Sequence, residues 1–255
     1  MNSYELYEKL SEKYPSELSC VWDNDGIMVS PGPVSEVEKV LVCLDATEDA
    51  LIYAAENGFD TVITHHPMIF SPLKNVTPET NVGRKAIFAL MNGITVMSFH
   101  TRLDAAKGGV NDALAEALEL SDVTSFGDAE CPTMGRIGAA DGFTVASFYE
   151  KVKEKLSGGA VCYTADGNQP CRKVAVLGGA GKDFIYAARD AGADVFVTGE
   201  ASYTALLDAA ENSVSVITAG HYETEAPVCK KLKEALRELA PDVYVEALSG
   251  FNNSI

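Results

Sequence analysis

The chain has 255 residues, a length that fits one large domain or two small ones. It carries 37 acidic and 20 basic residues, giving a formal net charge of −17. This excess of acid argues against a nucleic-acid partner, because such binding depends on Lys and Arg at phosphates. The apolar fraction of 47% and the charged fraction of 22% are typical of a globular protein and exclude a largely disordered chain.

The chain shows no targeting or membrane signal. Residues 1–20 mix charged and apolar side chains at helical spacing, whereas a signal peptide needs a basic start and an unbroken apolar run. No segment reads as a membrane helix. The six cysteines are scattered without a C-x-x-C pair, which favours reduced thiols over a disulfide framework. We therefore expect a cytoplasmic protein that does not contact a membrane.

Short β-branched runs alternate with helix-length amphipathic stretches. The runs predict strands at 40–45, 61–64, 94–99, 174–177, 194–198 and 214–218. The stretches predict helices at 47–57, 80–92, 109–119, 182–191, 201–211 and 225–239. This alternation is typical of the α/β class with a largely parallel sheet. The segment 121–142, which contains four glycines and a proline, is predicted to hold the domain boundary.

An internal repeat divides the chain. A shift of 134 residues aligns 39–64 with 173–198, and a shift of 121 aligns His100 with His221. The repeat predicts two similar α/β halves, 1–127 and 128–255, each a mostly parallel or mixed sheet flanked by helices, with a metal site between them. Chance similarity between two strand-helix units is the alternative explanation.

The four histidines of the chain each end or follow a predicted strand: His65, His66, His100 and His221. In open α/β sheets, ligands bind beyond the carboxyl ends of the strands. Two acids, Asp104 and Glu225, each stand four residues after a histidine. The pattern predicts that these side chains converge on one site.

Neutral imidazoles with carboxylates are the ligand set for Zn²⁺, Mn²⁺ or Fe²⁺. These donors exceed what one tetrahedral ion needs, and a pair of divalent ions would use them all. Two structural alternatives stay open. His100 could be a hydrogen-bonded residue that supports Asp104 or a neighbour, and the two acids could be helix N-terminal charges.

Two loops are weaker candidates. The loop LGGAGKD at 177–183 resembles a phosphate loop, but Val176 and Asp183 break the Walker pattern. It predicts a tight strand-to-helix turn, with anion contact through backbone amides as the alternative. WDNDG at 22–26 holds the only tryptophan and is either a capped turn or a substrate contact. No G-x-S-x-G or H-E-x-x-H motif is present in the sequence.

Five motifs together resemble the family of GTP cyclohydrolase 1 type 2 homologues. They are THHPMIF (64–70), SFHTRLDAAKGGVNDALAEAL (98–118), AGHYETE (219–225), WDNDG (22–26) and TGE (198–200). The resemblance spans nearly the whole chain. One departure is Ile27-Met28-Val29-Ser30, where the family tends to have Leu-Gln-Val-Gly.

The resemblance implies a two-domain α/β fold, assembly into a toroidal homohexamer and two divalent metal ions per chain. It places the metal ligands at His65, His66, Asp104, His221 and Glu225. Glu225 would bridge the ions, and His100 would sit beside them. The ligand set does not distinguish Zn, Mn, Fe and Co.

Two function hypotheses follow. The first is a metal-dependent hydrolase that acts on a nucleotide or related heterocycle, with His100 as a proton shuttle. Cations for a triphosphate are few, and the candidates are Arg102, Lys107 and Lys182. The second is a non-catalytic metal-binding ring that acts in regulation, metal handling or protein interaction.

Overall fold

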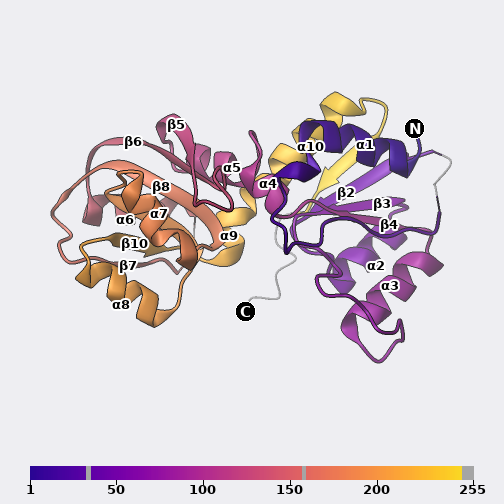
Figure 1. Cartoon of the computed structure of the whole chain (residues 1–255). Helices are drawn as coiled ribbons and strands as arrows, with labels where there is room; N and C mark the ends of the chain where they lie inside the picture. The colour runs from indigo at the N-terminus through magenta and orange to yellow at the C-terminus, as the bar shows by residue number, and fades with distance from the viewer. Residues whose placement is uncertain (33–35, 157–158, 249–255) are drawn as a thin grey trace. The chain divides into compact units, whose positions relative to one another are not determined.

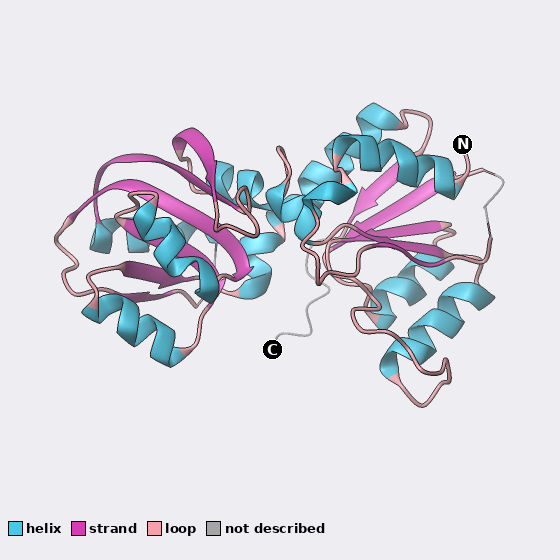
Figure 2. Cartoon of the chain, viewed as in Figure 1, coloured by secondary structure: helices cyan, strands magenta, loops and turns pink. Residues whose placement is uncertain are grey.

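The computed structural model describes residues 1–32, 36–156 and 159–248. The chain divides into two compact units, here called the first unit (Met1–Leu103 and Cys229–Ile255) and the second unit (Asp104–Val228). These bounds differ from the predicted halves, 1–127 and 128–255, because two strands pair elsewhere. The strand at 121–126 joins the sheet of the second unit, and the strand at 244–247 joins that of the first. Each unit has its own sheet with flanking helices (Figures 1 and 2), which confirms the predicted α/β class.

In the first unit the described strands run in the order β1-β4-β3-β2-β11. Their bounds are β1 (Gly26–Val29), β2 (Lys39–Cys43), β3 (Thr61–Thr64), β4 (Thr95–Ser98) and β11 (Tyr244–Ala247). All are parallel except β1, which is antiparallel to β4. Every residue of β3 and β4 is buried, which explains why these runs lack the polar alternation of a half-exposed strand.

Helices cover both faces of this sheet. They are α1 (Ser3–Lys13), α2 (Glu48–Glu56), α3 (Asn81–Met91) and α10 (Pro227–Leu239), with the short η1 (Ser16–Leu18) after α1. Figure 1 shows α1 and α10 on one face, and α2 and α3 on the other. The start of α1 is fixed by a capping box, in which Asn2 accepts from the amide of Glu5 and the Glu5 side chain accepts from the amide of Asn2.

In the second unit the described strands run in the order β5-β6-β8-β9-β10-β7. Their bounds are β5 (Ser121–Phe126), β6 (Gly135–Thr144), β7 (Val161–Tyr163), β8 (Pro170–Ala180), β9 (Val195–Glu200) and β10 (Ser215–Thr218). The central strands β8, β9 and β10 are parallel, and the other three pair antiparallel. The sheet is therefore mixed.

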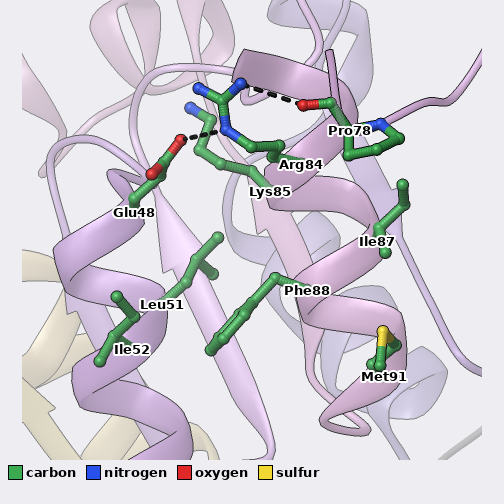
Figure 3. Close-up of a pocket in the computed structure, with 9 residues that line it drawn as sticks. All are labelled: Glu48, Leu51, Ile52, Pro78, Arg84, Lys85, Ile87, Phe88 and Met91. Atoms are coloured by element: carbon green, nitrogen blue, oxygen red, sulfur yellow. Dashed lines mark hydrogen bonds and ion pairs between the residues drawn. The ribbon is translucent and has the colours of Figure 1, made fainter. Parts of the chain in front are cut away.

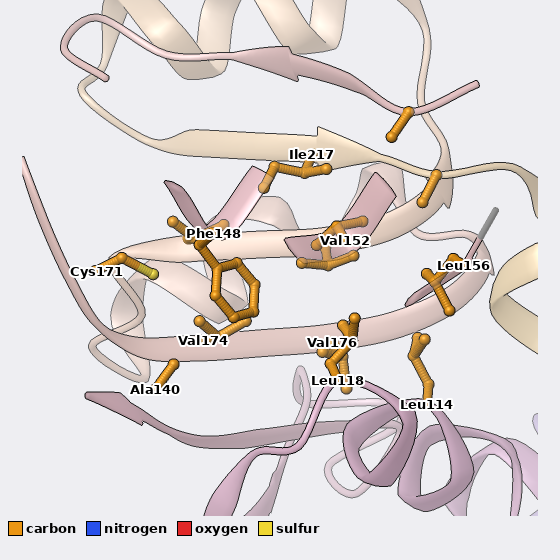
Figure 4. Packing of buried hydrophobic residues seen from close by; sticks show 14 of the residues in the cluster. Leu114, Leu118, Ala140, Phe148, Val152, Leu156, Cys171, Val174, Val176 and Ile217 are labelled. Carbon is orange, nitrogen blue, oxygen red and sulfur yellow. The ribbon is translucent and has the colours of Figure 1, made fainter. Parts of the chain in front are cut away.

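Helices of the second unit are α5 (Val110–Ala117), α6 (Val145–Leu156), α7 (Ile185–Asp190), α8 (Tyr203–Glu211) and α9 (His221–Glu225), with η2 (Lys182–Phe184) before α7. Figure 4 shows the core that α5 and α6 form with the sheet. Phe148 and Val152 of α6 and Leu114 of α5 pack with Val174 and Val176 of β8, all fully buried. This burial is the main source of stability for the unit.

Residues 121–142, predicted to hold the boundary, instead form two paired strands. A Cβ atom on Gly135 would lie 2.3 Å from the ring of Phe126, and one on Gly138 would lie 2.8 Å from the carbonyl oxygen of Ser121. These glycines therefore let β5 and β6 approach each other closely. From the sequence, these glycines are interpreted as a domain boundary. A close approach of two backbones produces no apolar pattern that would indicate strands instead.

The repeat is confirmed by matching register and hydrogen bonds. Val40 pairs with Thr61 in the first unit, and Val174 pairs with Val195 in the second, which is the same register after the shift of 134. The Asp60 carboxylate accepts from the amides of residues 38 and 39, and the Asp194 carboxylate accepts from those of residues 172 and 173. The likeness therefore extends beyond composition to specific contacts.

The helix predicted at 225–239 occurs as α10, and the structure adds a short helix directly before it. The short α9 ends at Glu225, and α10 begins at Pro227. Proline suits the first position of a helix because it has no amide hydrogen to leave unsatisfied there. Among the described residues, no helix combines the length and hydropathy needed to cross a membrane.

Candidate metal centre

Three histidines gather at one edge of the first unit's sheet. His65 and His66 directly follow β3, and His100 comes two residues after β4. Because β3 and β4 are parallel neighbours, their carboxyl ends meet at that edge. One ring nitrogen from each histidine lies within 4.8 Å of those of the others. The structure thus brings together the three histidines of the first unit, as the sequence predicted.

Each of these rings is held through Nδ1 by an oxygen atom. Nδ1 of His65 lies 3.0 Å from the carbonyl oxygen of Phe99, that of His66 lies 2.8 Å from Asp45 Oδ1, and that of His100 lies 2.7 Å from Asp23 Oδ1. Carbonyl and carboxylate oxygens accept hydrogen bonds, so Nδ1 donates in each pair. The neutral ring then carries its lone pair on Nε2, which is the tautomer that a metal ion requires.

The second unit places the fourth histidine beside a buried carboxylate. His221 begins α9, its Nδ1 lies 2.9 Å from Glu200 Oε1, and its Nε2 lies 3.2 Å from Glu225 Oε2. With Nδ1 donating to Glu200, a neutral ring would direct its Nε2 lone pair at a carboxylate oxygen. A proton shared by these two atoms, or a metal ion bound by both of them, would remove the repulsion. The arrangement therefore fits a pair of ligands to one cation.

Glycines of the LGGAGKD loop make room for this pair. A Cβ atom on Gly179 would lie 2.2 Å from Glu225 Oε1 and 3.1 Å from His221 Nε2, and one on Gly178 would lie 3.0 Å from Glu225 Cγ. Gly179 also has a φ of +63°, a conformation that favours glycine. The loop is thus shaped by the close approach of α9.

Three amides of the same loop donate to side chains of the second unit. The amide of Gly178 donates to Asn111 Oδ1 at 2.8 Å, that of Gly179 to Thr224 Oγ1 at 3.1 Å, and that of Gly181 to Thr198 Oγ1 at 3.0 Å. These three donors are therefore satisfied within the second unit. The structure supports the tight-turn interpretation of the loop over anion contact.

The two acids of the predicted set are both buried. Asp104 lies in α4 (Thr101–Ala105) and is 8% exposed, and Glu225 is 4% exposed. Asp104 lies in the first turn of α4, and Glu225 lies two residues before α10 begins at Pro227, so both acids also stand where a helix N-terminus favours negative charge. Buried carboxylates need a positive partner, a hydrogen-bond donor or a proton, which is consistent with a role as metal ligands.

The sequence missed the carboxylates that hold the histidines. Asp23, Asp45 and Glu200 each accept from a histidine Nδ1. Two of them lie in quoted motifs, Asp23 in WDNDG and Glu200 in TGE. Asp45 is the last residue of the predicted strand 40–45. In the sequence, the only signal for these three acids is that each lies in a quoted motif or at the end of a predicted strand.

Asp23 is the most strongly bound of these acids. Its side chain is fully buried, and its Oδ2 accepts from both the amide and the hydroxyl of Thr101. Burial raises the pKa of Asp23, but the hydrogen bonds from His100 and Thr101 outweigh it and lower the pKa to about 2. Asp23 is thus ionised when His100 donates to it. WDNDG is a tightly bonded turn that positions His100.

Arg102, a predicted contact for a triphosphate, is not available for one. It is 1% exposed, and its Nε donates to Asp25 Oδ2 at 2.7 Å. Its guanidinium lies 5.1 Å from the ring centre of Phe99 and also donates to Tyr7. Arg102 therefore stabilises the first unit as one member of a buried ion pair.

A separate groove of about 280 Å³ lies between α2 and α3 of the first unit (Figure 3). Leu51, Ile52 and Phe88 form its apolar floor, and Glu48 pairs with Arg84 at its rim. None of the histidines lines it. The groove is therefore distinct from the histidine cluster.

Fold and site together define a class: α/β proteins of two similar units whose strand ends carry histidines and carboxylates able to bind divalent metal ions. Comparison with known proteins agrees with this class. Residues 1–252 match the profile of the Duf34/NIF3 (NGG1p interacting factor 3) family, and the chain belongs to this family.

Relatives in this family match most of the chain in sequence. The chain is 32% identical over 228 residues to a GTP cyclohydrolase 1 type 2 homolog of Clostridium perfringens, covering 88% of this chain and 87% of the relative. A homolog of the same name from Methanocaldococcus jannaschii is 30% identical over 239 residues, covering 92% and 95%.

Solved structures confirm the fold. A hypothetical protein of Staphylococcus aureus superposes with a TM-score of 0.92 at 25% identity and covers 100% of this chain and 98% of its own. Reduced HcgD from Methanocaldococcus jannaschii superposes with a TM-score of 0.85 at 29% identity, and the match covers 98% of each chain.

Proposed function

We propose that the chain is a divalent-metal hydrolase that acts on a nucleotide or a related heterocycle. The observation that carries the proposal is the hydrogen bonding of the four histidine rings. Each of the four rings donates its Nδ1 hydrogen to a fixed oxygen, which directs Nε2 toward ligation. The names of the relatives, GTP cyclohydrolase 1 type 2 homolog, support the choice of reaction class.

The proposed ligands are His65, His66, Asp104, His221 and Glu225, and they would hold two ions per chain. The donor set fits Zn, Mn, Fe or Co, because it combines imidazole nitrogens with carboxylate oxygens. A pair of such ions lowers the pKa of water and polarises the bond under attack. We further propose a homohexamer located in the cytoplasm.

The residues of the chain would prepare the reaction. Asp23 accepts the Nδ1 hydrogen of His100 and fixes the orientation of the ring, so that Nε2 would be the nitrogen that exchanges a proton with the substrate. Thr101 in turn donates two hydrogen bonds to Asp23. This chain of contacts gives His100 one orientation, as proton transfer at a defined atom requires.

Metal content tests the first part of the proposal. Protein purified without chelator is analysed for metals, beside His65→Ala, Glu225→Ala and the control Glu211→Ala on the exposed face of α8. Because a dinuclear site holds two ions, we expect about two ions per chain in the parent and in the control. We expect the metal content to fall in the other two variants. Unchanged metal content in both ligand variants contradicts the ligand assignment.

Turnover tests the second part. The metal-loaded parent is incubated with GTP and a panel of nucleotides, and His100→Gln is the comparison. We expect turnover in the parent and a loss of about 10²–10⁴-fold in the variant, the usual contribution of a general acid or base. Full metal content without turnover of any member of the panel contradicts the hydrolase assignment and favours a non-catalytic role.

A further inference from the structure

Two exposed aromatic side chains stand next to the histidine cluster of the first unit. Trp22 is 62% exposed and Phe70 is 52% exposed. Their ring centres are 6.3 Å apart, and they lie 6.4 Å and 6.2 Å, respectively, from the ring centre of His100. All three pairs meet edge to face, at angles between ring planes of 60° to 90°. Large aromatic rings exposed beside a polar cluster indicate a binding surface.

Hydrogen bonds hold the loops that carry these two rings. Asn24, two residues after Trp22, donates from Nδ2 to the carbonyl oxygen of Ile69, which directly precedes Phe70, at 2.5 Å. Asp23 is bonded to His100 and Thr101 on the buried side of the same turn. These hydrogen bonds fix the turn that exposes Trp22. They also hold the rings of Trp22 and Phe70 in place relative to His100.

We propose that Trp22 and Phe70 bind a planar aromatic ring of the substrate and present it to the histidine cluster. This inference rests on the function proposed above and names the part of the substrate that is recognised. Stacking on an aromatic side chain needs no positive charge. That property suits a chain with a net charge of −17 whose Arg102 is buried in an ion pair. Recognition would therefore favour the base over the phosphates.

Trp22 provides its own readout, because it is the only tryptophan of the chain. Its fluorescence is titrated in metal-loaded, full-length protein with guanosine, adenosine and cytidine, and with ribose 5-phosphate as the probe without an aromatic ring. Free N-acetyltryptophanamide corrects for absorption by the nucleosides. We expect saturable quenching by at least one nucleoside and none by ribose 5-phosphate.

Two variants locate the effect. Phe70→Leu keeps the fluorophore and should weaken the binding of that nucleoside by about tenfold or more, as loss of one stacking partner does. Tyr203→Leu removes an aromatic ring that is 66% exposed on α8 and should leave binding unchanged. Equal affinity in the parent and Phe70→Leu overturns the proposal.

Other outcomes separate this inference from the proposed function. Absence of saturable quenching by all three nucleosides, with metal bound, overturns the ring proposal and leaves the metal site standing. A blue-shifted, concentration-dependent Trp22 emission that no nucleoside alters shows that a second copy of the chain covers the surface, which also overturns it. Quenching without turnover supports the ring proposal and counts against the hydrolase.

Discussion

At the scale of single residues, the oxygen that accepts from Nδ1 decides what a histidine can do. A carboxylate at that position raises the basicity of the ring and fixes its orientation, and both effects strengthen metal binding. Asp45 holds the ring of His66 through this contact, at 2.8 Å. The contact spans 21 residues of sequence, so its importance is visible only in the folded chain.

Asp45→Ala should therefore weaken metal binding by about 10–100-fold, the usual cost of losing such a partner. Asp49→Ala is the matched control, since it removes the same charge from the exposed first turn of α2. Isothermal titration of the apoprotein with Zn²⁺ or Mn²⁺ measures both. Equal affinities in the two variants would show that Asp45 does not support the site.

The lowered pKa of Asp23 predicts a pH dependence of stability. Its ordinary value is 3.8 and its folded value is about 2, so the folded state favours the ionised form. This contribution is fully present above about pH 4 and is lost as the pH falls through 2. The difference in unfolding free energy between the parent and Asp23→Asn should therefore be constant above about pH 5 and shrink below pH 4. Urea unfolding at a series of pH values measures it, and a difference that grows on acidification contradicts the assignment.

The buried pair of Arg102 and Asp25 predicts a large loss of stability. Arg102→Ala leaves the Asp25 carboxylate buried without its partner and should lower the unfolding free energy by about 3–5 kcal/mol. Arg84→Ala breaks the exposed pair with Glu48 and should cost at most about 1 kcal/mol. Denaturant unfolding compares the two, and similar losses would refute the structural role of Arg102.

At the scale of elements, two short segments of the second unit hold His221 and Glu225 together: the end of β8 and the helix α9. The glycines that close β8 leave a space that the side chains of His221 and Glu225 fill. A residue with a side chain at those positions would push α9 away. This steric requirement, together with the positive φ of Gly179, explains the Gly-Gly pair in LGGAGKD.

Gly179→Ala should therefore abolish most metal binding, because its Cβ would meet Glu225 Oε1 at 2.2 Å. Gly192→Ala is a matched control, since Gly192 also has a positive φ, of +86°, but its Cβ would meet nothing closer than 3.8 Å. Both variants place an alanine at a positive φ, which costs roughly 1–2 kcal/mol. Metal analysis separates them, and equal metal content would show that the glycine serves the backbone alone.

At the scale of the whole molecule, the repeat gives both units the same parallel core with one antiparallel strand beside it. β1 pairs antiparallel with β4, and β7 pairs antiparallel with β10 in the same way. The units differ on the opposite edge, where β11 is parallel to β2 and β6 is antiparallel to β8. The chain thus uses one arrangement twice and completes each sheet differently.

The proposed homohexamer predicts a molecular mass about six times the 27.1 kDa of the chain. Size-exclusion chromatography with light scattering measures this mass directly. Sedimentation velocity over a range of protein concentrations is the control for weak self-association. A mass near that of one chain at every concentration contradicts the assembly.

The sequence predicted the central strands because burial on both faces gives continuous apolar runs. All six predicted strands occur, as β2, β3, β4, β8, β9 and β10. It missed β6, which is largely buried, because its glycines are interpreted as breaks. It also missed the edge strands β1, β5, β7 and β11, in which fewer residues are buried. β5, for example, is exposed at every residue except Phe126. An exposed strand carries no apolar run to detect.

The sequence by itself determined the class of fold, the repeat and the histidines at the strand ends, because these depend on residue type and local spacing. Only the tertiary structure decided which atom holds each ring and which loops surround it. His100 and Asp23 are 77 residues apart in sequence and 2.7 Å apart in space. The sequence made Arg102 a candidate phosphate contact, whereas the structure shows it buried and paired with Asp25, which is also 77 residues away in sequence. Such pairings form only when the sheet brings distant segments together, and no local pattern encodes them.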